Sequence, residues 1–313
     1  MSLTKIANRF INFYKKSSNW QILLTLIIIV LLMTYLQNNT SVYEGFGQKE
    51  KFVMKENEEA DDSFYAKLYD DIMGNETKNN YEIDEIIRLT NVDKNSNIMV
   101  SGSRTGEHVD IIKSKGINDV FGIDKSDVFV KKSKEKYPNN DYRKGNIEES
   151  MIVSNNTLSH VLCLDMSIYL IKDKRNVFQN IYSWLKPGGY LLLHIVDRDN
   201  FDTILDVSNP IIFFSPQKYA KERITTSHVK FKGLDYVADY QPDNKNNKAY
   251  FIEKFTDKKT NNVRKHRHTL YIPTQKQVLQ FALDVGFEIK DKIDLVDIDH
   301  QYQYIYILQR PTA

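Results

Sequence analysis

Short apolar runs alternate with stretches of helical periodicity from residue 97 onward, and this alternation limits the possible folds most. The candidate strands are residues 98–100, 120–123, 142–143, 161–164 and 190–196. The last run is long and apolar enough for a central strand that is buried on both faces. Strands that alternate with amphipathic helices predict an α/β fold built on a mainly parallel sheet.

Two helices of this domain can be located from their apolar positions and end signals. Between Phe178 and Leu185, apolar residues recur at i, i+3, i+4 and i+7, so one face of this segment must pack on the sheet. The Lys-Pro-Gly-Gly stretch at 186–189 ends that helix. A second helix begins at Thr274 and ends before Gly286, and Gln277 completes a capping box at its start.

The C-terminal part has a different pattern, typical of antiparallel strands. Residues 250–255 and 263–272 flank a polar turn and predict a hairpin, and 302–308 predict one more strand. Residues 201–247 contain three prolines and no sustained period, which indicates an insertion over the edge of the cleft.

The N-terminal region contains the most apolar stretch of the chain. Residues 20–36 contain no charge, and their length is near the low end of the ~17–25 residues that a spanning helix needs. Trp20 and Tyr35 flank the stretch, as interfacial aromatic residues do. We expect a basic segment at 1–19, a transmembrane helix at 20–36, a linker at 37–62 and one globular domain at 63–313.

Two other interpretations of the apolar stretch stay open, namely a signal peptide and a buried core helix. Basic residues before the stretch favour a cytosolic N-terminus, but three lysines soon after it weaken that bias. The sequence therefore predicts a single-pass membrane protein without deciding which side of the membrane holds the domain.

Composition excludes several classes of protein. The formal net charge of the 313 residues is +2, which disfavours nucleic acid as the main partner. The single cysteine, Cys163, excludes an intramolecular disulfide framework and a cysteine-based metal site. The oligomeric state is not determined by any of these features.

A glycine-containing loop follows the first strand of the domain. Residues 100–108 read Val-Ser-Gly-Ser-Arg-Thr-Gly-Glu-His, and Asp124 ends the second strand 22 residues after Gly102. Backbone N–H groups at such a loop can approach a nucleoside, and an acid at this distance can bind its ribose hydroxyls.

Several blocks together make the chain resemble the class I S-adenosylmethionine (SAM)-dependent methyltransferases over about residues 63–310. They are the loop at 100–108, Val-Phe-Gly-Ile-Asp-Lys-Ser at 120–126, Gly-Asn-Ile at 145–147, Val-Leu-Cys-Leu-Asp at 161–165 and Trp-Leu-Lys-Pro-Gly-Gly-Tyr at 184–190. The resemblance implies a Rossmann-like sheet of seven strands with an antiparallel C-terminal hairpin, which the predicted hairpin in the tail matches.

The resemblance also implies SAM as the cofactor and suggests the residues that would bind it. Those residues are Tyr69, Gly102, Ser103, Arg104, Gly106, Asp124, Lys125, Asn146, Ile147 and Leu164.

The loop departs from the family pattern at two positions. Val100 stands where the family has an acid, and Arg104 stands where it has the middle glycine. A non-glycine residue there can clash with the cofactor or be held at a backbone angle that costs ~1–3 kcal/mol. The Arg104 side chain could instead turn outward or bind a carboxylate of the ligand, so both alternatives stay open.

The candidates for a catalytic role are Asp165, Asp197, His266 and His268. Asp165 and Asp197 follow strands at the edge where α/β sheets bind ligands. The two histidines share one face of the predicted hairpin, where the simpler interpretation is a pair of hydrogen-bonded histidines. No third ligand is identifiable near them in the sequence, so no metal site is predicted.

The sequence therefore predicts a membrane-anchored, SAM-dependent methyltransferase that acts on a small molecule, a lipid or a protein. The alternative is an impaired methyltransferase-like domain with a structural or scaffolding role in a membrane-associated assembly such as a virus particle. A cleft filled by its own side chains would favour the alternative, and an open cleft would favour the enzyme.

Overall fold

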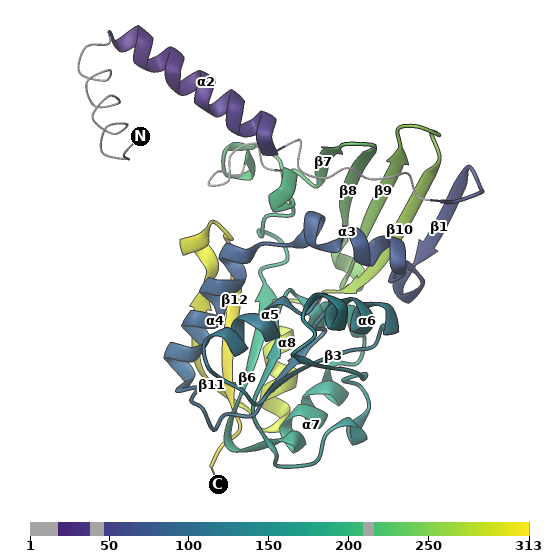
Figure 1. Ribbon diagram of the computed structural model, residues 1–313. Helices are drawn as coiled ribbons and strands as arrows, with labels where there is room; N and C mark the ends of the chain where they lie inside the picture. Colours follow the sequence, from purple (N-terminus) through teal and green to yellow (C-terminus); the bar gives the residue numbers. More distant parts are fainter. Residues whose placement is uncertain (1–17, 38–46, 209–215, 313) are drawn as a thin grey trace.

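The computed structural model describes residues 18–37, 47–208 and 216–312 (Figure 1). The predicted basic segment at 1–19 lies almost wholly outside the described residues. So do residues 38–46 of the predicted linker and 209–215 of the predicted insertion.

A seven-stranded sheet forms the centre of the main domain, with strand order β11-β12-β6-β5-β2-β3-β4. Its strands are β2 (Ile98–Ser101), β3 (Val120–Asp124), β4 (Asp141–Lys144), β5 (Leu158–Cys163), β6 (Leu185–Val196), β11 (Glu288–Asp294) and β12 (Gln303–Gln309). β2 to β6 pair in parallel, whereas β12 is antiparallel to both β6 and β11. This arrangement confirms the predicted Rossmann-like sheet.

Helices cover both faces of this sheet because each has an apolar side that must be buried. One core layer contains residues of α4 (Glu76–Thr90) and α5 (Glu107–Ser114), and the opposite layer contains residues of α7 (Lys174–Trp184). α8 (Gln275–Val285) packs beside α7 and begins with the predicted capping box at Thr274. α6 (Asp127–Lys136) follows β3.

A second sheet of five strands lies above the carboxyl ends of the parallel strands (Figure 1). Its order is β1 (Phe52–Glu56), β10 (Val263–Tyr271), β9 (Lys248–Asp257), β8 (Leu234–Asp243) and β7 (Thr226–Phe231). The predicted hairpin at 250–272 is β9 and β10, but its assignment to the main sheet was wrong. The antiparallel hairpin of the main sheet is β11 and β12 instead.

The N-terminal part of the domain joins the two sheets. β1 pairs in parallel with β10, and a short 3-10 helix, η1 (Asn57–Ala60), leads into α3 (Ser63–Met73). Residues 52–60 were predicted as part of a linker and instead form these ordered elements. α3 packs its buried face against β7, β8 and β9 of the second sheet and against Phe129 of α6.

Residues Asn19–Gln37 form α2, over the stretch predicted to span a membrane. Of the helices described, none has both the length and the apolar character that crossing a membrane requires. The predicted transmembrane helix at 20–36 is therefore not supported.

Candidate active site

The glycine-containing loop connects β2 to α5 at the carboxyl edge of the main sheet. Gly102, Arg104 and Gly106 all have positive φ, at 65°, 47° and 93°. The Arg104 N–H donates to Asp124 Oδ2 at 3.0 Å, and Ser103 N–H donates to Ile123 O at 3.0 Å. These bonds hold the loop against the end of β3 although an arginine has replaced a glycine.

Gly106 is required by packing. A Cβ atom at this position would lie 2.5 Å from the hydroxyl oxygen of Tyr142, which donates a hydrogen bond to the Gly106 carbonyl at 2.8 Å. Any side chain there would also be held at an unfavourable φ. The Tyr142 contact therefore fixes the turn from which α5 begins.

Asp124 is a buried carboxylate at the end of β3. Besides the Arg104 N–H, it accepts the Ser126 N–H at 2.9 Å. Each carboxylate oxygen can accept two hydrogen bonds, so each has capacity left for a hydroxyl donor. The geometry fits an acid that binds the ribose of a nucleoside.

The Arg104 side chain lies beneath the N-terminal part of the domain. Its guanidinium carbon lies 4.7 Å from the ring centre of Phe129 and 5.7 Å from that of Tyr69. Nη1 lies 2.7 Å from Asp61 Oδ2 but is not aligned for a hydrogen bond, and it has no other partner among the described residues. Burial lowers the pKa of Arg104, but the carboxylates of Asp61 and Asp124 outweigh burial and raise it, so the side chain is a buried cation.

Two cavities meet beside this loop. The smaller, about 60 Å³, is lined by residues that include Asp124, Asn146 and Ile147. The larger, about 250 Å³, lies between the two sheets, and most of its wall is apolar or aromatic. Both cavities are lined by Gly102, Arg104, Ser167 and Leu170. A nucleoside in the smaller cavity would therefore have its other end at the larger one.

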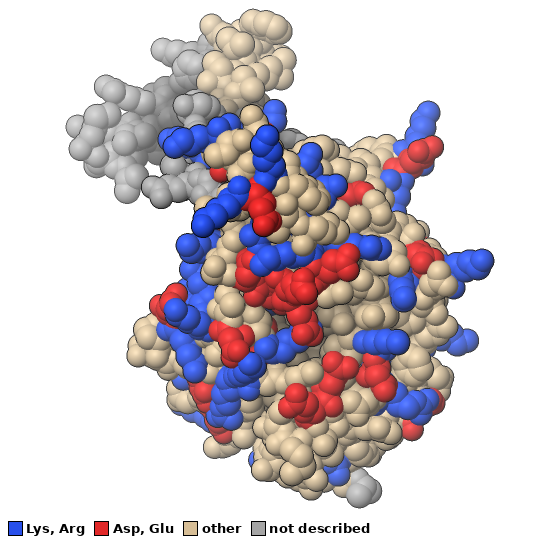
Figure 2. Space-filling view, turned by 90° about the vertical axis from the view of Figure 1, so that its right-hand side faces the viewer, with Lys and Arg blue, Asp and Glu red and all other residues tan. Residues whose placement is uncertain are grey.

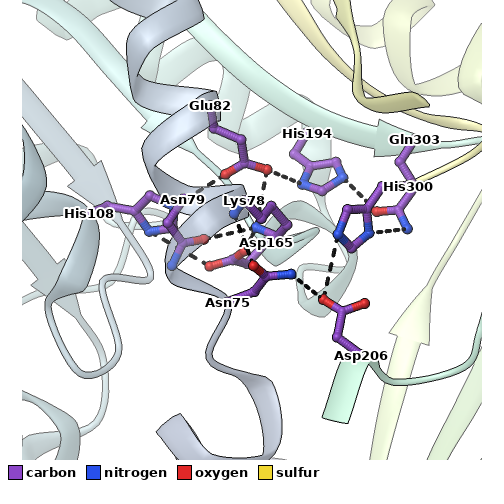
Figure 3. Close-up of polar contacts among 10 residues, drawn as sticks. All are labelled: Asn75, Lys78, Asn79, Glu82, His108, Asp165, His194, Asp206, His300 and Gln303. Atoms are coloured by element: carbon purple, nitrogen blue, oxygen red, sulfur yellow. Dashed lines mark hydrogen bonds and ion pairs between the residues drawn. The ribbon is translucent and has the colours of Figure 1, made fainter. Parts of the chain in front are cut away.

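A polar network forms one corner of the larger cavity (Figure 3). The Lys78 ammonium on α4 donates to Asp165 Oδ1 at 2.6 Å, Glu82 Oε1 at 3.1 Å and Asn79 Oδ1 at 3.1 Å. Burial lowers the pKa of Lys78, but the two carboxylates raise it by more. Burial likewise raises the pKa of Asp165, while Lys78 and His108 lower it by more. Lys78 and both acids are therefore charged.

Two groups of side chains resemble metal sites in composition, but their hydrogen bonds argue against a metal. Glu82, His108 and Asp165 are close together, but the Lys78 ammonium already binds both carboxylates. In the second group, with Glu253 and His268, His266 Nε2 accepts a hydrogen bond from Arg264 at 2.8 Å. A neutral imidazole that accepts at Nε2 has its proton on Nδ1, so neither nitrogen is free to bind a metal.

Comparison with known proteins agrees with this geometry. Residues 100–193 match a family model described as a methyltransferase domain. The match is confined to this stretch, which holds the strands β2 to β5, most of β6 and the glycine-containing loop. No curated protein matches the sequence at a significant level.

Several solved structures, all of methyltransferases, share the fold of this chain. A SAM-dependent methyltransferase from Clostridium acetobutylicum is 14% identical with a TM-score of 0.59, and the match covers 79% of this chain and 96% of that one. The CcbJ methyltransferase from Streptomyces caelestis is 13% identical with a TM-score of 0.61, over 79% and 96% of the two chains. The sugar N-methyltransferase KedS8 from Streptoalloteichus is 14% identical with a TM-score of 0.57, over 87% and 97%.

Most of the residues predicted to bind the cofactor line the two cavities. They are Gly102 and Arg104 in both cavities, Asp124, Lys125, Asn146 and Ile147 in the smaller, and Tyr69 in the larger. Ser103, Gly106 and Leu164 lie outside the lining of both cavities. Their roles in binding stay predictions, as do those of the lining residues.

The four catalytic candidates are separated by the structure. Asp165 and His268 line the larger cavity. His266 is fully buried behind it, and Asp197 is not in its lining and organises a turn by accepting from the Asp199 N–H and Asn200 Nδ2.

Sequence reasoning missed most of the polar corner. The candidates named from the sequence do not include Lys78, Glu82, His194, His300 or Gln303. The one available signal was the spacing of Lys78 and Glu82, which places both on one face of a helix.

Proposed function

We propose that the chain is a SAM-dependent methyltransferase whose acceptor binds in the larger cavity. The observation that carries the proposal is the junction of the two cavities at Gly102, Arg104, Ser167 and Leu170. SAM supplies an activated methyl group, so the protein needs mainly to align donor and acceptor and to exclude water. Two joined cavities at the carboxyl edge of the sheet suit that task.

The residues of the site fit SAM in three respects. Asp124 has acceptor capacity for ribose hydroxyls. Asn146 and Ile147 line the smaller cavity, where the base would lie. Arg104 lines both cavities, and its positive charge would attract the carboxylate of the methionine part.

A small-molecule acceptor suits the larger cavity better than a polymer. Its volume of about 250 Å³ lies between the two sheets, close to the lower end of the range for ligand pockets. On the face shown in Figure 2, the acidic and basic side chains of the described residues are mixed, without the continuous basic surface that phosphate backbones require. KedS8 is described as acting on a sugar, which supports a small acceptor for this fold as a proposal only.

One experiment distinguishes the proposed enzyme from the alternative hypothesis, an impaired domain with a structural or scaffolding role. Full-length protein is titrated calorimetrically with SAM and with S-adenosylhomocysteine (SAH), beside Asp124→Ala and the control Asp127→Ala. Asp127 is exposed on α6, three residues further along the chain. We expect micromolar binding that falls at least tenfold in Asp124→Ala and is unchanged in Asp127→Ala.

Two results would contradict the proposal. Absence of binding by every form would favour a structural role for the domain. Binding only after Arg104→Gly would mean that the natural loop no longer accepts the cofactor.

A further inference from the structure

Lysines gather at one end of the second sheet, the end furthest from the main domain (Figure 1). The opposite end is tied to the main domain, because Lys174 Nζ of α7 donates to the carbonyl of Tyr271 on β10 at 2.7 Å. The far end consists of residues 47–54, 230–235 and 254–265, which we call the distal end. Its lysines are Lys49, Lys51, Lys230, Lys232, Lys254, Lys258, Lys259 and Lys265.

The distal end has few acids to balance these eight lysines. Its acids are Glu50, Asp235 and the buried Asp257. Only one of the lysines, Lys258, forms an ion pair within the part of the chain that the structure describes, with its Nζ 3.0 Å from Asp235 Oδ1. Lys265 is half-buried and the other seven lysines are exposed. The distal end therefore presents a positive charge to the solvent.

Two of the lysines lie directly opposite each other. Lys254 of β9 and Lys265 of β10 are partners in the antiparallel ladder, and their other neighbours in the sheet, Val237 and Met54, are uncharged. α3 packs on the sheet face that contains Phe255, so the alternation along β9 places Lys254 on the other face. Like charges at opposite positions destabilise a sheet. An anionic partner on this face would relieve the repulsion.

Exposed apolar side chains accompany these charges. Phe52 and Met54 of β1 are 53% and 42% exposed, and they pair with Val263 and Lys265 of β10. Earlier in the chain, α2 contains no charged residue and has nine large apolar side chains that are exposed. Exposed apolar groups beside a basic surface are typical of proteins that bind at the surface of a membrane.

The length of the chain limits how far α2 can lie from the distal end. Nine residues separate Gln37, the last residue of α2, from Gly47. Even fully extended, this segment covers at most about 35 Å. With α2 in lipid, the distal end is held close to the lipid surface, and the short tether raises the effective concentration of the lysines there. Contact of this kind does not require a helix that crosses the bilayer.

We propose that the distal end binds the surface of a membrane that contains anionic phospholipids, with α2 inserted among the lipids beside it. The inference does not depend on the proposed function. A nucleic acid is the other polyanion that lysines bind, but it would leave the apolar surface of α2 without a partner. The exposed cations of the distal end are all lysines, whose single charges suit the diffuse negative layer of the headgroups. Its one arginine, Arg264, is buried and binds Asp62.

Vesicle binding by the full-length protein tests the proposal. The test variant has four substitutions at the distal end, namely Lys230→Gln, Lys232→Gln, Lys254→Gln and Lys265→Gln. The control variant has the same change of charge at exposed positions of the main domain, namely Lys94→Gln, Lys134→Gln, Lys186→Gln and Lys276→Gln. Urea denaturation establishes that both variants are folded.

The preference for anionic lipid should depend on the distal end. In about 0.15 M salt, we expect the natural protein to bind phosphatidylcholine vesicles with about 30% phosphatidylserine at least tenfold more tightly than pure phosphatidylcholine, and to lose this preference in about 1 M salt. A lysine near an anionic surface contributes roughly fivefold in affinity. The test variant should therefore bind the anionic vesicles at least tenfold more weakly, and the control variant within about threefold of the natural protein. Binding to pure phosphatidylcholine, through α2, should be equal in all three.

A fluorescent label shows which surface contacts the lipid. Cys163 is buried, so a polarity-sensitive label attaches selectively at Met54→Cys. Met151→Cys is the control site, since Met151 is 92% exposed on the main domain. We expect anionic vesicles to shift the emission of the label at position 54 to shorter wavelength and to leave the emission at position 151 unchanged.

Three results would overturn the proposal. Equal binding of the anionic vesicles by the natural protein and the test variant would mean that α2 alone makes the contact. An unchanged emission at position 54 would place another surface against the lipid. If the test variant keeps its vesicle binding but loses binding to single-stranded DNA, the partner of the distal end is a nucleic acid.

Discussion

Arg104 keeps a left-handed backbone conformation, with φ of 47°, at a position where the family pattern has glycine. That conformation costs a non-glycine residue about 1–2 kcal/mol. The side chain offsets the cost, because its guanidinium packs against Phe129 and Tyr69 and lies beside the Asp61 carboxylate. The arginine is therefore integrated into the domain core and does not simply replace a lost glycine.

Replacing Arg104 by glycine should destabilise the fold although it relieves the backbone. Breaking a buried ion pair costs about 3–5 kcal/mol, and each cation–π contact adds about 0.5–2 kcal/mol. We expect Arg104→Gly to lower the free energy of unfolding by about 2 kcal/mol or more, measured by urea denaturation. Asn91→Gly is the matched control, since Asn91 has φ of 54° at the exposed end of α4 and should gain slightly. Equal stability of the two variants would show that the Arg104 contacts contribute nothing.

At the residue scale, sequence reasoning located the cofactor side of the site better than the acceptor side. The spacing of Gly102 and Asp124 is a local signal, because loop and acid belong to neighbouring strands. The polar corner has no such signal. Lys78 and Asp165 come from α4 and the end of β5, and only the folded sheet brings their charges within 2.6 Å.

α3 illustrates at the element scale how a helix is fixed between two sheets. Its N-cap, Asp62, accepts the N–H groups of Phe64 and Tyr65 through Oδ1, both at 3.1 Å. The other oxygen accepts hydrogen bonds from Lys55 and Arg264. One carboxylate thus begins the helix and ties it to both β1 and β10.

The charge of Asp62 should contribute stability only above its titration range. Burial raises the pKa of Asp62, but Lys55, the Tyr65 N–H and Arg264 lower it below the ordinary value of 3.8. Since the folded-state pKa is the lower one, the contribution is fully present above pH 4 and is lost as the pH falls through the folded-state pKa. We expect Asp62→Asn to cost about 1–3 kcal/mol of unfolding free energy at pH 7 and progressively less below pH 4, measured by urea denaturation.

A second substitution separates the charge of Asp62 from its role as a cap. Asp62→Ala removes both and should cost about 1 kcal/mol more than Asp62→Asn at every pH. A constant difference between natural protein and Asp62→Asn down to pH 2 would contradict the assigned charge pairing.

The second sheet shows which elements the sequence could and could not predict. β8 buries Leu234, Tyr236, Ala238 and Tyr240 in strict alternation. This period-two pattern is visible in the sequence, but the interpretation of residues 201–247 as an irregular insertion overlooked it. β1 could not be found in this way. Its five residues pair in parallel with β10, which follows far along the chain, so its pairing depends on the fold as a whole.

At the scale of the whole molecule, the second sheet encloses the space above the carboxyl ends of the parallel strands. Tyr240, Phe251, His268 and Leu270 form one wall of the larger cavity, while Gly102, Asp165 and His194 belong to the main domain opposite. The smaller cavity is lined entirely by the main domain. The binding of SAM and the binding of the methyl acceptor should therefore depend on different parts of the molecule.

Filling the wall that the second sheet contributes should separate acceptor binding from cofactor binding. Leu270 on β10 is half-buried and lines the larger cavity, so Leu270→Trp would occupy part of its volume without touching Asp124 or Asn146. Phenol serves here as a small aromatic probe of the larger cavity. We expect calorimetry to show SAH affinity within about threefold of the natural protein, while phenol binding to the SAH complex falls at least tenfold, about 1.4 kcal/mol. Leu283→Trp, at a 40% exposed position on α8, is the control for the size of the new side chain. Loss of SAH binding in Leu270→Trp alone would mean that the cofactor extends to the second sheet and that the two cavities form one undivided site.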